Sequence, residues 1–416
     1  MKSFILSSSN IERDGFFWNM TGSLLMAFQS VIFLMILTRT VGLNDSGIFT
    51  IAYANANLFL NIGKYGMRNY QVSDVKNEFR FREYLTSRWI TTCIMIGVSI
   101  IFVLYIASQN QYTVEKSQII VWMCLFKIAD SLEDVYYGEY QKRGRLDIAS
   151  KSMTMRMLFT IIVFATVAIY TRNLLITLVI TTCVSTLIMA LFLKWTYPIF
   201  KDDYPKRSGS IRSLLKKCFP VFLSSFLAFY IGNAPKYAID TQLTDELQAC
   251  YGFIAMPVFV IGLLNGFVFT PMLYRLSCLW NERKAKEFSK AIWKQILIVF
   301  GITAVCIFGA YIFGVPILSL LYNTDLQPYK MELLILLLGG GFLGASGVLN
   351  TAITIIRCQS ALAIGYAIVS LIAFSLSNYI VKWYGIMGAS VLYVALMFLL
   401  CISFGGILYV AMKKAE

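Results

Sequence analysis

The sequence predicts an all-α polytopic membrane protein with about twelve transmembrane helices. Three observations indicate this class. The chain has 416 residues, of which 58% are hydrophobic and 14% charged. Its mean hydropathy is +0.68. Windows of about 20 apolar residues, the length that crosses a bilayer, recur along the chain with short polar connections between them.

Twelve apolar segments are expected to span the membrane. The N-terminus is not expected to be a signal peptide, because its apolar run is too short and a charged stretch follows it. None of the connections is long enough for a separate soluble domain, and an even number of spans places both termini on one side. The predicted spans are 15–39, 46–66, 86–108, 117–140, 153–171, 173–194, 218–236, 248–274, 291–314, 331–356, 360–381 and 387–411.

The basic residues predict the orientation of these spans. With the N-terminus in the cytoplasm, 28 of the 36 Lys and Arg residues fall on cytoplasmic ends and loops, six fall outside, and two lie within spans. Cytoplasmic loops of membrane proteins carry this excess. Topology therefore explains the net charge of +14 without nucleic-acid binding, and basic loops also suit anionic membrane lipids.

A polar segment near the middle of the chain divides the spans into two groups of six. It reads "YPIFKDDYPKRSGSIRSLLKK" and includes prolines, serines and lysines. We expect an N-terminal lobe at 1–200, a cytoplasmic linker at 201–217 and a C-terminal lobe at 218–416. Residues 45–70 align weakly with 250–275, which favours a parallel repeat about an axis along the membrane normal. Two such lobes typically enclose a cavity whose opening alternates.

Several classes of chemistry are not supported. Histidine is absent, and the nine cysteines are scattered through apolar segments without a CxxC pair. There is no phosphate-binding GxxxxGK[ST] loop. We therefore expect no metal site, no cofactor and no enzymatic activity.

Polar residues within the second predicted span form one helical stripe. Asn57, Asn61, Lys64 and Arg68 are spaced at i, i+4, i+7 and i+11. Either they bond to neighbouring helices, with the bases reaching the interface, or they line a cavity. Because a charge inside the membrane is costly and usually faces a cavity or a partner, we favour the cavity for Lys64.

The fourth predicted span carries both signs of charge. Lys127 and Asp130 are three residues apart and can pair on one helix, while Glu133 and Asp134 follow within a turn. These residues are either a structural ion-pair network or a cation site gated by Lys127. Arg156, one turn inside the fifth span, is the expected counter-charge. We assign Lys127 and Arg156, with the stripe of the second span, to substrate binding, and Asp130, Glu133 and Asp134 to ion coupling or gating.

Two further sites fall in the second half. Lys236 and Asp240 lie at the end of the seventh span, where Pro235 is expected to break the helix and expose backbone groups. Arg357 lies at the opposite end of that half. We assign Lys236 and Arg357 to substrate binding and Asp240 to ion coupling or gating.

The chain resembles Wzx-type polysaccharide flippases of the multidrug/oligosaccharidyl-lipid/polysaccharide exporter superfamily. The mid-chain linker matches the two-lobe layout of these proteins. The segments that carry the resemblance are "LTRTVGLNDSGIFTIAYA" (37–54), "EDVYYGEYQKRGRLDIASKSMTMR" (133–156) and "NAPKYAIDTQLTDELQACYGFIAMPVFVIGLL" (233–264). The resemblance implies two six-helix lobes of the MATE-like kind, a cationic cavity and alternating access. The chain is shorter than the fourteen-helix lipid II flippases, which argues against that substrate.

The resemblance also implies a function and its partners. The expected activity is flipping of an undecaprenyl-diphosphate-linked glycan from the inner to the outer leaflet of the bacterial cytoplasmic membrane, driven by an ion gradient. Membrane lipids and other polysaccharide-assembly proteins are the expected partners. A drug or small-cation antiporter of the same fold, a membrane glycan polymerase or ligase, and a structural membrane protein remain alternatives.

Overall fold

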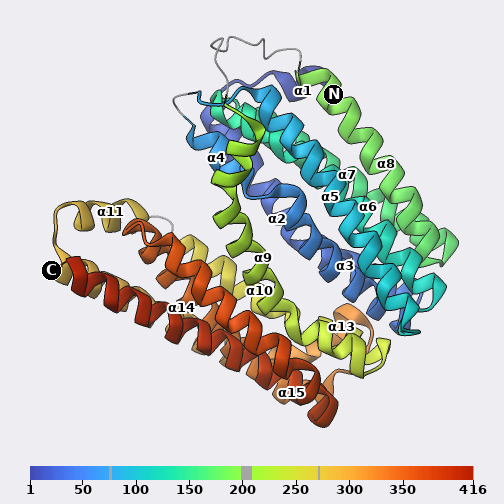
Figure 1. The fold of residues 1–416 in the computed structure, drawn as a ribbon. Coiled ribbons are helices and arrows are strands. Elements are labelled where there is room, and N and C mark those ends of the chain that lie inside the picture. The colour runs from blue at the N-terminus through green and yellow to red at the C-terminus, as the bar shows by residue number, and fades with distance from the viewer. Residues whose placement is uncertain (75–76, 198–208, 270–271, 416) are drawn as a thin grey trace. The chain divides into compact units, whose positions relative to one another are not determined.

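The computed structural model describes residues 1–74, 77–197, 209–269 and 272–415, and these residues are almost entirely helical. The chain divides into two compact units, unit 1 from Met1 to Phe226 and unit 2 from Leu227 to Glu416 (Figure 1). Each unit is a bundle of helices with its own interior.

Unit 1 holds seven helices of more than 20 residues, or parts of them, and two short ones. The short helices are α1 (Lys2–Leu6) and α4 (Met67–Ser73). The long ones are α2 (Ile11–Thr40), α3 (Leu43–Lys64), α5 (Phe81–Ser108), α6 (Val114–Lys142), α7 (Leu146–Thr171), α8 (Leu174–Thr196) and the first part of α9 (Ile211–Gln242).

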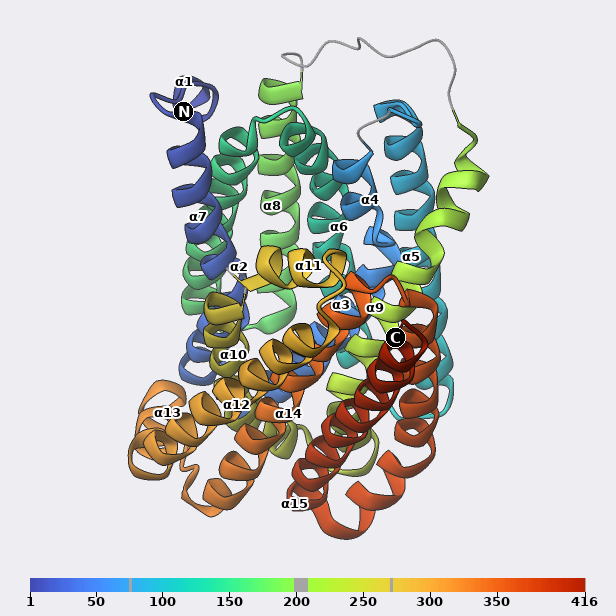
Figure 2. The same ribbon diagram turned by 90° about the vertical axis from the view of Figure 1, so that its left-hand side faces the viewer.

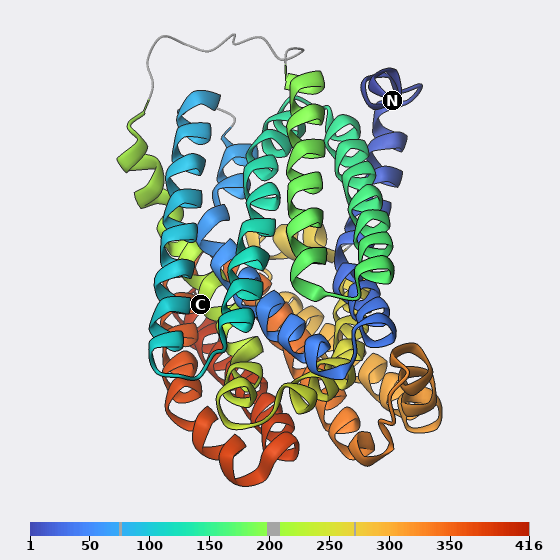
Figure 3. The same cartoon turned by 90° about the vertical axis from the view of Figure 1, so that its right-hand side faces the viewer.

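Helix α6 lies at the centre of unit 1. It packs against α3, α5 and α8, and α6, α7 and α8 lie side by side in Figure 3. Among the described residues, nine helices are long and apolar enough to cross a membrane by length and composition. Helices α3 and α6 are long but are not among the nine, because they carry the polar residues of the interior. They are covered by the more apolar helices around them.

Local sequence signals begin and end these helices. Asn10, Thr113 and Asn173 accept hydrogen bonds from the third backbone N–H that follows each of them, as N-capping residues do. Helix α3 ends where Tyr65 and Gly66 both adopt left-handed backbone conformations. A Cβ at Gly66 would lie 2.7 Å from Cγ1 of Val221 on α9. Glycine is therefore required both for this turn and for the close approach of α9.

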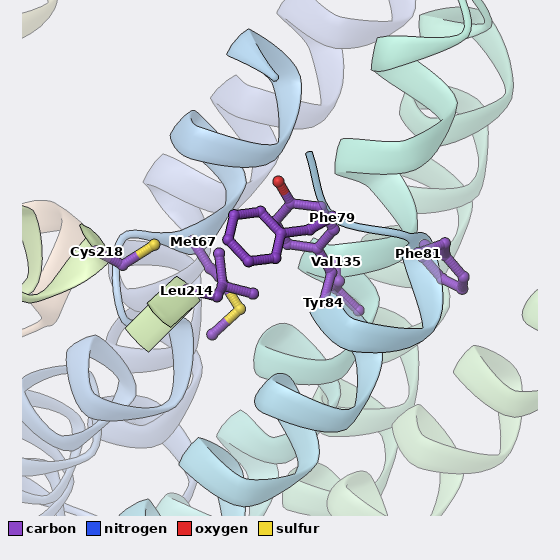
Figure 4. Packing of buried hydrophobic residues seen from close by; sticks show 7 residues of the cluster. All are labelled: Met67, Phe79, Phe81, Tyr84, Val135, Leu214 and Cys218. Carbon is purple, nitrogen blue, oxygen red and sulfur yellow. The ribbon is translucent and has the colours of Figure 1, made fainter. Parts of the chain in front are cut away.

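At one end of unit 1, an apolar cluster packs α4, α5 and α6 against the start of α9. Figure 4 shows its members, which come from α4, α5, α6, α9 and the loop before α5: Met67, Phe79, Phe81, Tyr84, Val135, Leu214 and Cys218. Tyr65 also stacks on Phe222, with ring centroids 4.5 Å apart. The first turns of α9 are thus part of the core of unit 1.

Unit 2 begins within α9 and is built around α14. Its helices are α10 (Asp245–Phe269), α11 (Leu273–Asn281), α12 (Ala285–Gly309), η3 (Ala310–Gly314), α13 (Val315–Tyr322), η4 (Gln327–Tyr329), α14 (Lys330–Ile355) and α15 (Gln359–Ala415). Helix α14 packs against α10, α12 and α15, and Figure 2 shows α12 and α14 next to each other. Helix α15 is two helices that meet at Gly385, whose φ of 56° and ψ of −140° are not helical.

The prediction of an all-α membrane fold with about twelve spans is confirmed: among the described residues, each predicted span coincides with a helix or with one of the two parts of α15. One detail was wrong. Pro235 does not break its helix, because α9 continues to Gln242; transmembrane helices tolerate proline when neighbouring groups satisfy the backbone. The eighth predicted span is helical as far as Phe269, residues 270–271 lie outside the described residues, and α11 begins at Leu273. Of the predicted linker, residues 201–208 lie outside the described residues, and its last seven residues belong to α9.

Candidate functional site

The interior of unit 1 contains a group of six interacting side chains, which we call the Arg156 network. It comprises Tyr53, Lys127, Asp130, Glu133, Tyr137 and Arg156. Nη2 of Arg156 lies 2.6 Å from a carboxylate oxygen of Asp130 and 2.5 Å from one of Glu133. The second oxygen of Asp130 accepts a hydrogen bond from Nζ of Lys127 at 3.0 Å. These contacts join α6 to α7 through charge-assisted hydrogen bonds, which are the strong ones in proteins.

The Arg156 network is electrically balanced and buried. Its two cations face two anions, and all four charged side chains are buried. The hydroxyl of Tyr137 donates to Glu133 at 3.0 Å, and Ser185 of α8 accepts from Arg156 at 3.0 Å. The ammonium of Lys127 also lies 4.5 Å from the ring centroid of Tyr53, a cation–π geometry. Such a group stays charged in an apolar bundle because each charge has a partner.

A second group, the Arg88 network, is centred on Asp134, which lies one turn of α6 beyond Asp130. Arg88 of α5 is fully buried; it donates to Asp134 at 2.8 Å and to the carbonyl of Gly63 at 2.8 Å. The hydroxyl of Thr91 donates to the same carbonyl at 2.8 Å. Arg68, whose side chain is 30% exposed, lies 3.6 Å from the other oxygen of Asp134. Asp134 is therefore shared between a buried and a half-buried arginine. Arg88 also caps the C-terminus of α3, because the carbonyl of Gly63 accepts its hydrogen bond.

The predicted stripe does not lie on one helix, because α3 ends at Lys64 and Arg68 lies on α4. The polar residues of the stripe also have different surroundings. Asn57 and Asn61 are half-buried, and each donates to the backbone carbonyl four residues earlier, at 2.8 and 2.9 Å. Lys64 is also half-buried, and it makes no ion pair within the part of the chain that the structure describes. Lys64 is thus an inboard base of unit 1 whose ammonium has no ion-pair partner among the described residues.

The predicted site residues of the second half all lie in unit 2. Lys236 and Asp240 are one turn apart on α9 and both half-buried. In the described residues of unit 2, Lys236 forms no ion pair. Arg357 is exposed at the end of α14, in a left-handed conformation with φ of 61°. The structure brings Lys236 and Asp240 together and leaves Arg357 at a helix terminus.

Sequence reasoning missed the residues that complete both networks. Arg88 is one of the 28 bases that the sequence predicts at cytoplasmic ends and loops, because it lies near the start of its span. Its side chain is nevertheless fully buried. Tyr53, Tyr137 and Ser185 gave no signal, since hydroxyl and aromatic residues are common in membrane helices. The position of Arg88 two residues inside the predicted span was the available clue.

Outside the spans, Asp74 organises the turn between α4 and α5. Its carboxylate accepts hydrogen bonds from the backbone N–H groups of Glu78 and Phe79 and from the hydroxyl of Tyr84. Lys142 lies 3.8 Å away. Burial opposes ionisation of Asp74, but these donors outweigh it and lower the pKa of the carboxyl below its ordinary value. Within the described residues, no three His, Cys, Asp or Glu side chains are placed to hold a metal ion.

The fold is that of MATE-like exporters. The chain is similar to an inward-facing multidrug-resistance MATE transporter of the MOP superfamily, with a TM-score of 0.67 and 13% identity over 94% of this chain and 95% of that one. It is also similar to the lipid II flippase MurJ in an inward closed conformation, with a TM-score of 0.68 and 15% identity over 97% and 89% of the two chains.

Sequence comparison narrows this class to one family. The family model described as "Polysaccharide biosynthesis protein" matches residues 13–277, and the chain belongs to that family. It is 23% identical over 334 residues to the capsular polysaccharide biosynthesis protein CapF of Staphylococcus aureus, covering 78% of this chain and 82% of CapF. The resemblance to polysaccharide exporters is confirmed, and the chain is a multi-pass membrane protein.

Proposed function

We propose that this protein is a flippase that moves a lipid-linked oligosaccharide from the inner to the outer leaflet of the bacterial cytoplasmic membrane. The observation that carries the proposal is the membership of a polysaccharide biosynthesis family combined with the fold of exporters, one of which flips lipid II. The carrier is an undecaprenyl diphosphate, both termini are cytoplasmic, and the protein is a transporter and not an enzyme.

The sugar diphosphate is the part of such a substrate that cannot cross hydrocarbon unaided, because its charge would lose its hydration. Lys64 offers an ammonium without an ion-pair partner among the described residues, while Asn57 and Asn61 lie on the same face of α3. Arg68, on the short helix α4 that follows, is half-buried and is held by Asp134 and by Gln141 at 3.0 Å; it can add a planar two-donor contact. We assign diphosphate binding in unit 1 to this face of α3 together with Arg68.

The remaining charges act as a gate in this proposal. Lys127 and Arg156 are already neutralised by Asp130 and Glu133, so a bound diphosphate must compete with those carboxylates. A coupling ion that binds or protonates them would free the two bases. In the second half, Lys236 and Arg357 are the proposed substrate contacts, and Asp240 is a second gating acid. Alternating access of the two lobes completes the cycle.

Flipping can be tested in proteoliposomes that contain the purified chain and a fluorescent diphosphate-linked glycolipid. An impermeant reagent added outside quenches only the outer leaflet. We expect Lys64→Gln to slow flipping roughly tenfold, the loss of one charge-assisted contact, and Lys64→Arg to be milder. Lys194→Gln, an exposed position on α8, is the matched control. Equal flipping of a neutral glycolipid by the wild type would contradict the proposal.

A drug antiporter of the same fold is the second candidate, supported by the similarity to MATE transporters. Deletion of the gene distinguishes a flippase from an antiporter by what accumulates in the cell. A flippase mutant accumulates lipid-linked oligosaccharide at the inner leaflet, whereas loss of an antiporter raises drug sensitivity and leaves the glycolipid pool unchanged.

A further inference from the structure

We propose that unit 2 binds an anionic phospholipid of the bilayer in a groove between α12, α14 and α15. The groove has a volume of about 730 Å³, within the range of pockets that hold small ligands. All its lining residues belong to unit 2, and most are apolar. This proposal concerns a resident lipid and does not depend on which substrate the protein transports.

The groove has one cationic end. Lys286, in the first turn of α12, and Lys413, in the last turns of α15, both line it. Since α12 begins where α15 finishes, the two ammonium groups belong to the same mouth. Ser289 adds a hydroxyl there, and the N-terminus of α12 contributes positive partial charge. The mouth therefore fits an anionic headgroup.

The opposite end of the groove is lined by aromatic residues. Phe300 of α12 and Phe342 of α14 both line it, and their ring centroids lie 5.4 Å apart in an edge-to-face arrangement. The thiol of Cys401 donates to the carbonyl of Phe342 at 2.9 Å. From Lys286 to Phe300 the groove follows α12 for roughly 21 Å at 1.5 Å per residue. That length covers the roughly 15 Å of hydrocarbon in one leaflet and its interface.

Two aromatic residues mark the headgroup level. Trp293 and Tyr409 line the groove within two turns of the lysines and are 64% and 69% exposed. Tryptophan and tyrosine are enriched where a membrane helix crosses the interface. Lysines, an aromatic level and apolar walls follow one another along the groove, as the charged headgroup, the interface and the acyl chains of a phospholipid do. Because the length of the groove matches one leaflet, we infer that its occupant is a lipid of the bilayer.

A glycine keeps the groove open. Gly405 of α15 lines it, and a Cβ built there meets nothing within 4 Å. A larger side chain at this position would project into the groove without backbone strain. The next residue, Gly406, also has open space around a Cβ but does not line the groove. Leucine at these neighbouring positions gives a test variant and its matched control.

Binding can be measured by tryptophan quenching with the full chain in neutral detergent. The probes are phosphatidylglycerol and phosphatidylcholine with brominated acyl chains, which quench nearby indoles. The chain has seven tryptophans, so the Trp293 component is the quenching that Trp293→Phe removes. We expect this component to saturate at lower concentrations of phosphatidylglycerol than of phosphatidylcholine. Lys286→Gln and Lys413→Gln should each weaken phosphatidylglycerol binding about fivefold, the effect of one lysine at an anionic surface.

The control variants distinguish specific binding in the groove from nonspecific contact with lipid. Gly405→Leu should remove most of the Trp293 component, while Gly406→Leu and Lys290→Gln, an exposed base of α12 outside the groove, leave it unchanged. Equal quenching by both lipids, or equal loss in the two leucine variants, would overturn the proposal. Displacement of phosphatidylglycerol by a lower concentration of polyprenyl diphosphate would also overturn it, because the groove would then belong to a substrate tail.

Discussion

Different interactions join the helices of unit 1 and those of unit 2. Among the described residues of unit 1, ten charged residues besides Asp74 are buried, and those at the centre form the Arg156 and Arg88 networks. In unit 2, Glu332 is the single buried charged residue among those that the structure describes. Its helices instead approach closely at glycines of α14: a Cβ at Gly339 would lie 2.5 Å from the ring of Tyr393, and one at Gly341 would lie 2.8 Å from Thr303.

This difference separates two functions of a membrane helix interface. Small residues let helices pack closely, since apolar side chains gain little by leaving lipid. Buried ion pairs give little net stability, but an unpaired partner is strongly destabilising. Unit 1 therefore contains charges whose arrangement can change when a ligand or ion competes for them, and unit 2 contains contacts that depend on shape alone. Substitutions in the two units should differ accordingly.

The largest effect is expected in the Arg156 network. Arg156→Leu leaves Asp130 and Glu133 buried with only Lys127 as a counter-charge. Breaking a buried pair from one side costs about 3–5 kcal/mol. We expect this loss in the free energy of unfolding, measured by thermal unfolding of the purified protein in detergent.

A second variant distinguishes charge from packing at this position. Arg156→Leu combined with Glu133→Gln restores the balance of one cation and one anion, so it should recover much of the lost stability. If the single variant unfolds within about 1 kcal/mol of wild type, the network is hydrated in solution and the contrast with unit 2 is smaller than the structure indicates.

The two arginines at Asp134 should differ from each other. Arg88 is fully buried and also donates to Gly63, whereas Arg68 is 30% exposed and 3.6 Å from the carboxylate. We expect Arg88→Gln to cost about 3 kcal/mol and Arg68→Gln less than about 1 kcal/mol, as for exposed pairs. The same unfolding assay measures both. Equal costs would show that Arg68 is as firmly held as Arg88, which would argue against its release to a substrate.

Hydropathy was sufficient to predict the helices, because twenty apolar residues have few alternatives in lipid. The spacing of Lys127 and Asp130 was sufficient to predict their pair, which is local. Arg88 with Asp134, and Arg156 with Ser185, could not be predicted in the same way, since they join helices whose relative rotation is set by packing. The prediction of a helix break at Pro235 was wrong for a related reason. The rule that proline breaks helices is local, and α9 continues through Pro235 within the bundle.

The close contacts of α14 give the corresponding test in unit 2. Gly339→Ala forces the Tyr393 ring to move, and overpacking of this kind costs about 1–3 kcal/mol. Gly347→Ala, on the same helix with nothing within 4 Å of its Cβ, should be neutral or slightly stabilising, because alanine favours helix. Thermal unfolding of the two variants compares them directly. If both are neutral, α14 tolerates rearrangement and shape does not hold unit 2 together.

A smaller effect than those at Arg156 and Arg88 is expected at Asp74, a charge of unit 1 that lies outside the predicted spans. Asp74→Asn keeps the size of the side chain but weakens the hydrogen bonds from Glu78, Phe79 and Tyr84, at a cost of about 1–2 kcal/mol. Because folding lowers the pKa of this carboxyl, its contribution is complete above the unfolded pKa of about 3.9 and is lost as the pH falls through the folded pKa. The difference in unfolding temperature between wild type and Asp74→Asn should therefore be constant from pH 8 to about pH 5 and shrink below about pH 4. A difference that grows on acidification would mean that the carboxyl is protonated in the folded protein, and Asp74 would then belong with the costly charges of the interior.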